Sequence, residues 1–242
     1  MREFVMLNQP WKLMCRSRML EKLDVEVTNS PEVPFMEKPR TPAWLIWLAC
    51  RLHAGSASLA EAADVIEWFG VDRTRQTVEN WYDNYTEYCE QEFTATPDRV
   101  AVDEKQIQIE EEQKVWLYAA IDVEQKVVLH AELSPRRGTK PATRFLRELK
   151  DRHNVEDAEF LGDGMGYLTA LARTDLDGEL NYSDRNIVEK LFQTVSMRIK
   201  RFHETWNSSQ ASAERWLTGF VHYYNHHRSH QTLDNQPPAK AL

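Results

Sequence analysis

Three acidic residues, Asp103, Asp163 and Glu189, have the types and local settings of a metal site. Asp103 ends the apolar run that starts at Val100, Asp163 follows a second apolar run and precedes Gly164, and Glu189 lies in a helical pattern. Transfer at a phosphodiester needs an activated water or hydroxyl and a stabilised leaving oxygen, which two Mg²⁺ ions about 4 Å apart supply. Mg²⁺ prefers hard oxygen ligands, so a few carboxylates suffice. The pattern predicts catalytic and metal-binding roles for these residues in phosphoryl transfer on nucleic acid.

The surrounding sequence predicts the elements that carry these carboxylates. Residues 99–103 and 158–163 have the character of buried strands that each deliver an aspartate at the strand edge, and glycine then lets the chain turn. At about 100° per residue, Glu189 falls at the edge of an apolar helical stripe, so it should point along the rim of a sheet. The stripe consists of Val188, Leu191, Phe192, Val195, Ile199 and Phe202.

Other residues compete for these roles, since a single acid is usually a surface charge or a cap. Asp122 also ends an apolar run, and the strand pattern alone does not separate it from Asp103. Glu104 lies on the opposite strand face by alternation, and we expect it to be solvated or paired. A zinc site is a further alternative, because three histidines have a spacing that zinc sites use, although no HExxH motif supports them. These are His222, His226 and His230.

Length and composition indicate a folded globular protein. The chain has 242 residues, of which 42% are hydrophobic, enough for a sizeable core. The longest apolar run, 43–50, is too short to span a membrane, and the N-terminus lacks a signal-peptide pattern, so we expect a cytoplasmic protein. The three cysteines form no CxxC pair and suggest neither a disulfide framework nor a cysteine zinc site.

The charge distribution is uneven. A net charge of −8 argues against a general nucleic-acid-binding surface, because Lys and Arg drive binding to phosphates. Positive charge is nevertheless concentrated in 136–150 and 185–201, beside two of the candidate carboxylates, although solvated helix faces are the plain alternative. The basic residues are Arg136, Arg137, Lys140, Arg144, Arg147 and Lys150 in the first segment, and Arg185, Lys190, Arg198, Lys200 and Arg201 in the second.

The first half of the chain predicts three helices after a proline-rich linker. We expect them over about 41–55, 58–70 and from 74, with a capping box at Ser58 and Glu61 and a stop at Gly70. This succession is compatible with a helix-turn-helix, and a plain three-helix bundle is the alternative. The residues able to contact bases or phosphates are Arg73, Arg75, Gln76 and Asn80, and nearby acids should make the contact salt-sensitive.

The second half predicts an α/β fold. Strands are expected over 100–109, 115–122 and 127–133, joined by charged turns. They are followed by a helix, a strand, a short helix after Tyr167, the Glu189 helix and a last helix over 211–226. Three antiparallel strands followed by alternating helix and strand make a mixed sheet flanked by helices.

Taken together, four stretches resemble DDE-type insertion-sequence transposases, which share the retroviral-integrase, RNase-H-like core. Within that group the resemblance is to insertion-sequence family six, in the form carried by salt-loving archaea. It covers the chain from about residue 40 to the end, and the tail 224–233 is also similar to such enzymes. The four stretches are 69–81, 100–104 with 116–122, 160–164, and 186–203.

The resemblance implies both a site and a domain organisation. Asp103, Asp163 and Glu189 would be the catalytic residues and would bind two Mg²⁺ or Mn²⁺ ions. The resemblance therefore favours Asp103 over Asp122 as the first metal ligand. Water would cleave DNA at the terminal inverted repeats of the element, and the freed 3′ hydroxyl would attack target DNA. The Lys and Arg clusters would contact donor or target DNA, and a homodimer or larger assembly would hold two element ends. The implied parts are an arm and linker (1–40), a helix-turn-helix module (41–95) and a catalytic domain (96–242).

The chain departs from the family pattern at three points. Only positions 164–188 separate the last two carboxylates, Ser196 stands where many relatives have a basic residue, and Gly162 replaces an apolar residue and should weaken the strand. A captured transposase acting as a non-enzymatic DNA-binding protein is therefore the main rival. An RNase-H-like nuclease without strand transfer is disfavoured, because it has little need of the N-terminal helices.

Overall fold

The computed structural model describes residues 33–36, 40–89, 93–109, 113–162, 165–180, 185–200 and 209–240. Most of the expected arm, together with Asp163 and Arg201, lies outside these ranges.

The three helices expected in the first half are present as α2 (Ala43–Ala54), α3 (Leu59–Glu67) and α4 (Arg75–Cys89). The capping box is confirmed, because Ser58 Oγ accepts the Glu61 N–H at 3.1 Å and Glu61 Oε2 accepts the Ser58 N–H at 2.7 Å. Gly70 follows α3 with φ +82°, a left-handed conformation that glycine adopts without a steric penalty. The helical module is therefore built from the local signals that predicted it.

The sheet has five strands in the order β3-β2-β1-β4-β5. β1 pairs antiparallel with β2, and β2 with β3, whereas β4 and β5 run parallel to β1. The predicted mixed α/β fold is confirmed, because three antiparallel strands are followed by strands that run parallel to β1. The strands are β1 (Arg99–Ile109), β2 (Gln113–Asp122), β3 (Val128–Ser134), β4 (Glu159–Gly162) and β5 (Gly178–Leu180).

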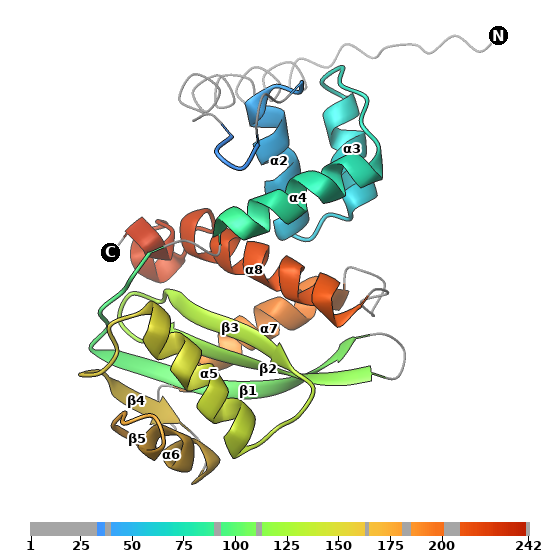
Figure 1. Cartoon of the computed structure of the whole chain (residues 1–242). Coiled ribbons are helices and arrows are strands. Elements are labelled where there is room, and N and C mark those ends of the chain that lie inside the picture. Colours follow the sequence, from blue (N-terminus) through green and yellow to red (C-terminus); the bar gives the residue numbers. More distant parts are fainter. Residues whose placement is uncertain are drawn as a thin grey trace, which may run out of the picture.

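Helices cover both faces of the sheet (Figure 1). α5 (Thr139–Arg152) and α6 (Met165–Ala172) pack on one face, where Phe145 and Tyr167 belong to one apolar cluster. α7 (Arg185–Ile199) and α8 (Gln210–His226) pack on the other face, in a second cluster. Two short 3₁₀ turns follow α8, at Gln231–Leu233 and Pro238–Lys240.

α8 lies between the helical module and the sheet (Figure 1). Trp216 Nε1 donates to the carbonyl of His53 at 3.2 Å, and Tyr82 Oη donates to the carbonyl of Trp216 at 3.2 Å. Tyr85 Oη lies 2.6 Å from Nδ1 of His222. One continuous apolar cluster therefore joins the module to the sheet through α8.

Within the part of the chain that the structure describes, no helix is both long and apolar enough to traverse a bilayer.

Candidate active site

Asp103 is the fifth residue of the eleven-residue strand β1 and is only 4% exposed. It lies inside the strand, so the expectation that it ends a strand was wrong. By alternation it shares a strand face with Ala101 and Ile107, which belong to the apolar cluster covered by α7 and α8. Its Oδ1 accepts the backbone N–H of Glu104 at 2.8 Å. The strand thus fixes a buried carboxylate on the α7 side of the sheet.

β4 delivers the chain to the side of β1. Ala101 pairs with Leu161 in parallel register, and the two preceding residues of each strand pair in the same register. β4 ends at Gly162, and the next residue in the sequence, Asp163, lies outside the described residues. The predicted strand before Asp163 is therefore present and adjacent to the strand that carries Asp103.

Gly162 has a structural reason. A methyl group added at Gly162 would lie 3.2 Å from Cβ of Tyr167 and 3.7 Å from Cγ2 of Val102. Tyr167 is buried on the α6 side of the sheet, so glycine lets α6 approach the end of β4 closely. The glycine that breaks the family pattern is accommodated by helix packing and does not prevent the strand from forming.

Glu189 lies in the first half of α7 and is half-buried. Its neighbour Val188 is fully buried in the cluster that also contains Ala101 and Leu161. The expected position at the edge of the apolar stripe is thus confirmed. α7 brings Glu189 to the same face of the sheet on which Asp103 lies.

Asp122 has a different role from Asp103. Its Oδ1 accepts the backbone N–H groups of Glu124 and Gln125, both at 2.8 Å, and so holds the turn between β2 and β3. Burial raises the pKa of Asp122 and these two hydrogen bonds oppose the rise. Asp122 pairs with Val100, three positions along β1 from Asp103. The structure therefore explains Asp122 as a turn residue.

Glu104 was expected to be either solvated or paired, and the structure shows that it is paired. Its Oε1 accepts Nε of Arg137, whose guanidinium also lies 4.9 Å from the ring centre of Trp116. Because Glu104 points to the α5 side, Arg137 reaches β1 beside Asp103 but from the opposite face of the sheet. Sequence reasoning missed Lys105, which is half-buried and shares the strand face of Asp103 by alternation, a relation that the period of two could have revealed.

The histidines considered for zinc do not share one helix face. α8 ends at His226, so His230 lies beyond the helix and packs against Tyr224 with ring centres 4.7 Å apart. The ring of His222 stacks on His226 at 4.6 Å and is bonded to Tyr85. These contacts give the rings roles in packing α8.

The residues expected to contact DNA fall into two groups. Arg198 and Arg73 are half-buried: Arg198 bonds the carbonyl of Gly55 and lies 5.6 Å from the ring centre of Tyr223, and Arg73 Nε donates to Thr41 Oγ1 at 2.9 Å. The others in the described ranges are exposed, namely Arg75, Gln76, Asn80, Arg136, Arg137, Lys140, Lys190 and Lys200.

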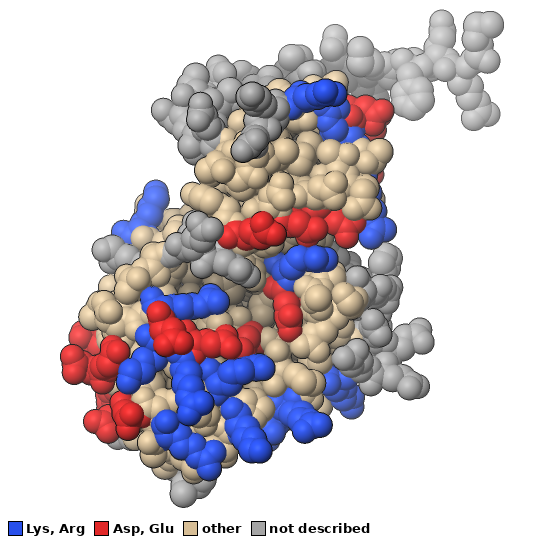
Figure 2. Space-filling view, in the orientation of Figure 1, with Lys and Arg blue, Asp and Glu red and all other residues tan. Residues whose placement is uncertain are grey.

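Basic side chains are numerous on one part of the surface. Figure 2 shows many Lys and Arg over the lower part of this view, where α5 lies in Figure 1, with some acidic side chains among them and a further acidic band along the lower edge of the helical module. Arg136, Lys140 and Arg147 are exposed members of the basic part. An overall acidic chain therefore still presents a basic surface.

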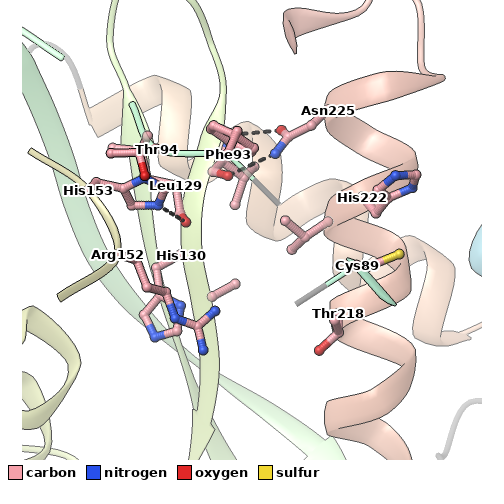
Figure 3. Close-up of a pocket in the computed structure, with 13 residues that line it drawn as sticks. Cys89, Phe93, Thr94, Leu129, His130, Arg152, His153, Thr218, His222 and Asn225 are labelled. Atoms are coloured by element: carbon pink, nitrogen blue, oxygen red, sulfur yellow. Dashed lines mark hydrogen bonds between the residues drawn. The ribbon is translucent and has the colours of Figure 1, made fainter. Parts of the chain in front are cut away.

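A pocket of about 360 Å³ lies away from the carboxylates, between β3 and α8 (Figure 3). Asn225 of α8 clamps its wall, because its side-chain amide both accepts the N–H of Val128 and donates to the Val128 carbonyl, each at 2.9 Å. His153 Nε2 lies 2.8 Å from the carbonyl of Leu129. Neither Asp103 nor Glu189 lines this pocket, which follows the sheet edge.

No protein-family model matches the sequence, and no curated protein matches it. Among solved structures, the chain is similar to the catalytic core domain of BIV integrase, with a TM-score of 0.46 and 11% identity over 60% of this chain and 93% of that chain. It is similar to the HTLV-2 integrase catalytic core domain in complex with magnesium, with a TM-score of 0.44 and 8% identity over 60% and 95%.

A third similarity is to the simian T-cell lymphotropic virus intasome in complex with PP2A regulatory subunit B56 gamma, with a TM-score of 0.46 and 11% identity over 79% of this chain and 71% of that chain. At these TM-scores the similarity is partial, and the function has to be inferred from the site itself.

Proposed function

We propose that the chain is a DDE-type transposase that cleaves DNA at the ends of a mobile element and joins the freed 3′ hydroxyl to target DNA. The observation that carries the proposal is the convergence of three elements on one face of the sheet. β1 holds Asp103 there in a buried position, α7 brings Glu189 to it, and the parallel neighbour β4 ends immediately before Asp163. Membership of insertion-sequence family six is part of the proposal and rests on the sequence motifs.

The donor atoms fit a hard divalent cation. Asp103, Asp163 and Glu189 offer carboxylate oxygens, which Mg²⁺ and Mn²⁺ prefer, and the burial of Asp103 places one of them where electrostatic attraction is stronger than in water. When bound, a pair of such ions activates the attacking oxygen and stabilises the leaving one.

The chain's own residues supply rigidity and orientation. Asp103 lies in β1, which is paired with β2 on one side and β4 on the other, so its backbone is held more rigidly than it would be in a loop. Lys105 lies two residues further along the same strand face and would contact a DNA phosphate near the carboxylates. α7 also connects Glu189 to the helical module, because Arg198 of α7 donates a hydrogen bond to the carbonyl of Gly55 in the turn after α2.

DNA is assigned to two surfaces. The exposed residues Arg75, Gln76 and Asn80 at the start of α4 would contact the terminal inverted repeats. The basic surface around α5, with Arg136 just before the helix and Lys140 in its first turn, would contact the backbone of donor or target DNA. Two element ends have to be held together, so the active form is a homodimer or a larger assembly.

The test is a cleavage and joining assay on the DNA that flanks the gene, which should contain short inverted repeats. With Mg²⁺ or Mn²⁺ we expect cleaved ends and joined products. Asp163→Asn and Glu189→Gln should each lower the rate about 100-fold or more, since loss of a metal ligand removes several kcal/mol of transition-state stabilisation. Asp157→Asn is the matched control and should retain the rate, because Asp157 is exposed in the turn just before β4.

Three outcomes separate the rivals. Joined products that depend on the metal and on both carboxylates support the transposase. Specific binding to the repeats without any metal-dependent product would support the non-enzymatic DNA-binding protein instead. Cleavage without joining would identify a nuclease.

A further inference from the structure

A second group of potential metal ligands lies at the edge of the sheet, away from the candidate active site. His130 and Glu132 belong to the edge strand β3, and Glu148 belongs to α5. Each offers one ligand atom, and these three atoms all lie within 4.8 Å of one another. β2 separates β3 from β1, so the group is two strands from Asp103.

A β-bulge aims the histidine at the acids. Ala120 pairs with His130 but Ile121 pairs with Val128, so Leu129 is an extra residue in β3. His130 and Glu132 are two positions apart and therefore share a strand face, the one that α5 covers. The ring of His130 stacks on Phe145 of α5 with centres 5.0 Å apart, which fixes its direction.

His130 carries the observation that points to a ligand. The residue is 7% exposed, and its buried Nε2 makes no hydrogen bond while it lies 3.4 Å from Oε2 of Glu148. A buried polar atom without a hydrogen bond costs about 1–3 kcal/mol, so its persistence needs a reason. Ligand atoms around a tetrahedral zinc ion lie roughly 3.4 Å apart, which is the separation already present between Nε2 and Oε2.

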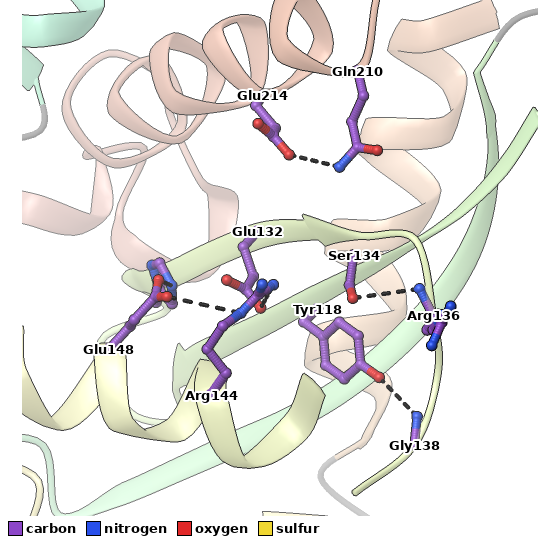
Figure 4. A network of polar contacts seen from close by, with 10 residues as sticks. Tyr118, Glu132, Ser134, Arg136, Gly138, Arg144, Glu148, Gln210 and Glu214 are labelled. Carbon is purple, nitrogen blue, oxygen red and sulfur yellow. Dashed lines mark hydrogen bonds and ion pairs between the residues drawn. The ribbon is translucent and has the colours of Figure 1, made fainter. Parts of the chain in front are cut away.

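In this structure the guanidinium of Arg144 pairs with both carboxylates of the group (Figure 4). Its Nη2 lies 3.1 Å from Oε1 of Glu132, and its Nε lies 3.8 Å from Oε1 of Glu148. The Arg144 side chain is 53% exposed, so it can turn into solvent without unpacking the core. The ion pairs neutralise the two carboxylates, whereas Nε2 of His130 has only its 3.4 Å contact with Glu148 and no well-aligned hydrogen bond.

We propose that His130, Glu132 and Glu148 form a binding site for a divalent transition-metal ion such as Zn²⁺, which displaces Arg144 and ties α5 to β3. One imidazole nitrogen and two carboxylates suit Zn²⁺ better than Mg²⁺, which favours all-oxygen sites. The site is independent of the proposed transposase chemistry, because none of its residues belongs to the carboxylate triad.

The test is a titration of the full chain with Co²⁺ and Zn²⁺, in an Asp103→Asn background that weakens metal binding at the candidate active site. Visible absorption of Co²⁺ reports ligation, and Zn²⁺ displacement of Co²⁺ gives the affinity. We expect one ion per chain. His130→Ala and Glu148→Gln should each weaken binding about 100-fold or more, because each removes a direct ligand, whereas loss of an outer-shell partner costs about 10–100-fold.

Two further variants distinguish a defined site from a generally acidic pocket. Arg144→Gln removes the competing cation and should tighten binding severalfold. Glu214→Gln is the matched control, because Glu214 of α8 lines the same surface pocket as His130, Glu132 and Glu148, and Gln210 Nε2 donates to its Oε1 at 2.8 Å. It should change the affinity less than about threefold, unlike loss of a ligand.

Absence of Co²⁺ ligation in the Asp103→Asn chain with all three ligands intact would overturn the proposal. So would binding that neither His130→Ala nor Glu148→Gln weakens. Because Glu148 is 42% exposed on α5, the Glu148→Gln variant keeps the test valid if His130→Ala fails to fold.

Discussion

At the scale of single residues, Asp103 and Asp122 have similar sequence settings but differ in what their carboxylates contact. Asp103 and Asp122 both follow apolar runs, and both are buried. Asp122 accepts two backbone N–H groups in a turn, whereas Asp103 lies inside β1 on the face that α7 covers. Sequence alternation cannot distinguish these, because the difference lies in backbone hydrogen bonds and in a helix more than 80 positions later in the chain.

Gly162 gives a residue-scale prediction. In Gly162→Ala the new methyl group would press on Cβ of Tyr167 at 3.2 Å, so α6 or the end of β4 has to shift. Overpacking of this kind costs about 1–3 kcal/mol. We expect lower stability in urea unfolding and a reduced cleavage rate, because Asp163 follows directly.

Gly166→Ala is the matched control for that change. A methyl group at Gly166, in the exposed part of α6, would meet its nearest neighbour, Thr139 Oγ1, at an ordinary 3.9 Å. Alanine favours the helix by about 1 kcal/mol, so this variant should be slightly more stable. Equal stability of Gly162→Ala and wild type would show that α6 does not press on the end of β4.

At the scale of elements, local signals predicted most helices and strands. α3 and α8, predicted over 58–70 and 211–226, are present as Leu59–Glu67 and Gln210–His226, and the other predicted helices are present as well. β5 was missed because a three-residue strand at Gly178–Leu180 shows no alternation, and only pairing with β4 defines it. The strand predicted over 100–109 is present as β1, and it places Asp103 inside the strand, so the separate expectation that Asp103 ends a strand was wrong.

The end of α2 gives a prediction on pH. Burial lowers the pKa of His53 to about 4, while its hydrogen bond to the carbonyl of Ala57 opposes the change. Below the ordinary pKa of about 6.5 the unfolded chain takes up a proton that the folded chain does not, so stability falls with decreasing pH from about 6.5 to about 4. The loss between pH 7 and pH 5 should be about 2 kcal/mol.

His53→Gln isolates this effect, because glutamine cannot titrate and retains a donor for the Ala57 carbonyl. Urea unfolding at pH 7 and pH 5 should show a smaller difference for this variant than for wild type. The same pH dependence in both proteins would mean that His53 titrates normally in the folded state.

At the scale of the whole molecule, α8 determines how the parts are joined. It contacts the helical module through Trp216 and His222 and covers the sheet with its other side, so one apolar cluster extends through both. The sequence predicted the helices but not this shared core, because the contacts join residues more than 130 positions apart. The fold likewise gathers many basic residues on the surface around α5, with acidic side chains among them (Figure 2).

The central claim is that Asp103 binds the catalytic metal ion, and a change of metal preference tests it most directly. In Asp103→Cys a soft thiolate replaces a hard carboxylate, and Mg²⁺ binds thiolate poorly whereas Mn²⁺ and Cd²⁺ tolerate it better. The measurement is the DNA cleavage rate in each metal, with wild type as the reference and unfolding curves to establish that the variant folds.

We expect a loss of about 100-fold or more for Asp103→Cys in Mg²⁺ and a substantial recovery in Mn²⁺ or Cd²⁺, if Asp103 binds the metal ion. An undiminished rate in Mg²⁺ would contradict it, as would an equal loss in every metal by a folded variant that still binds DNA.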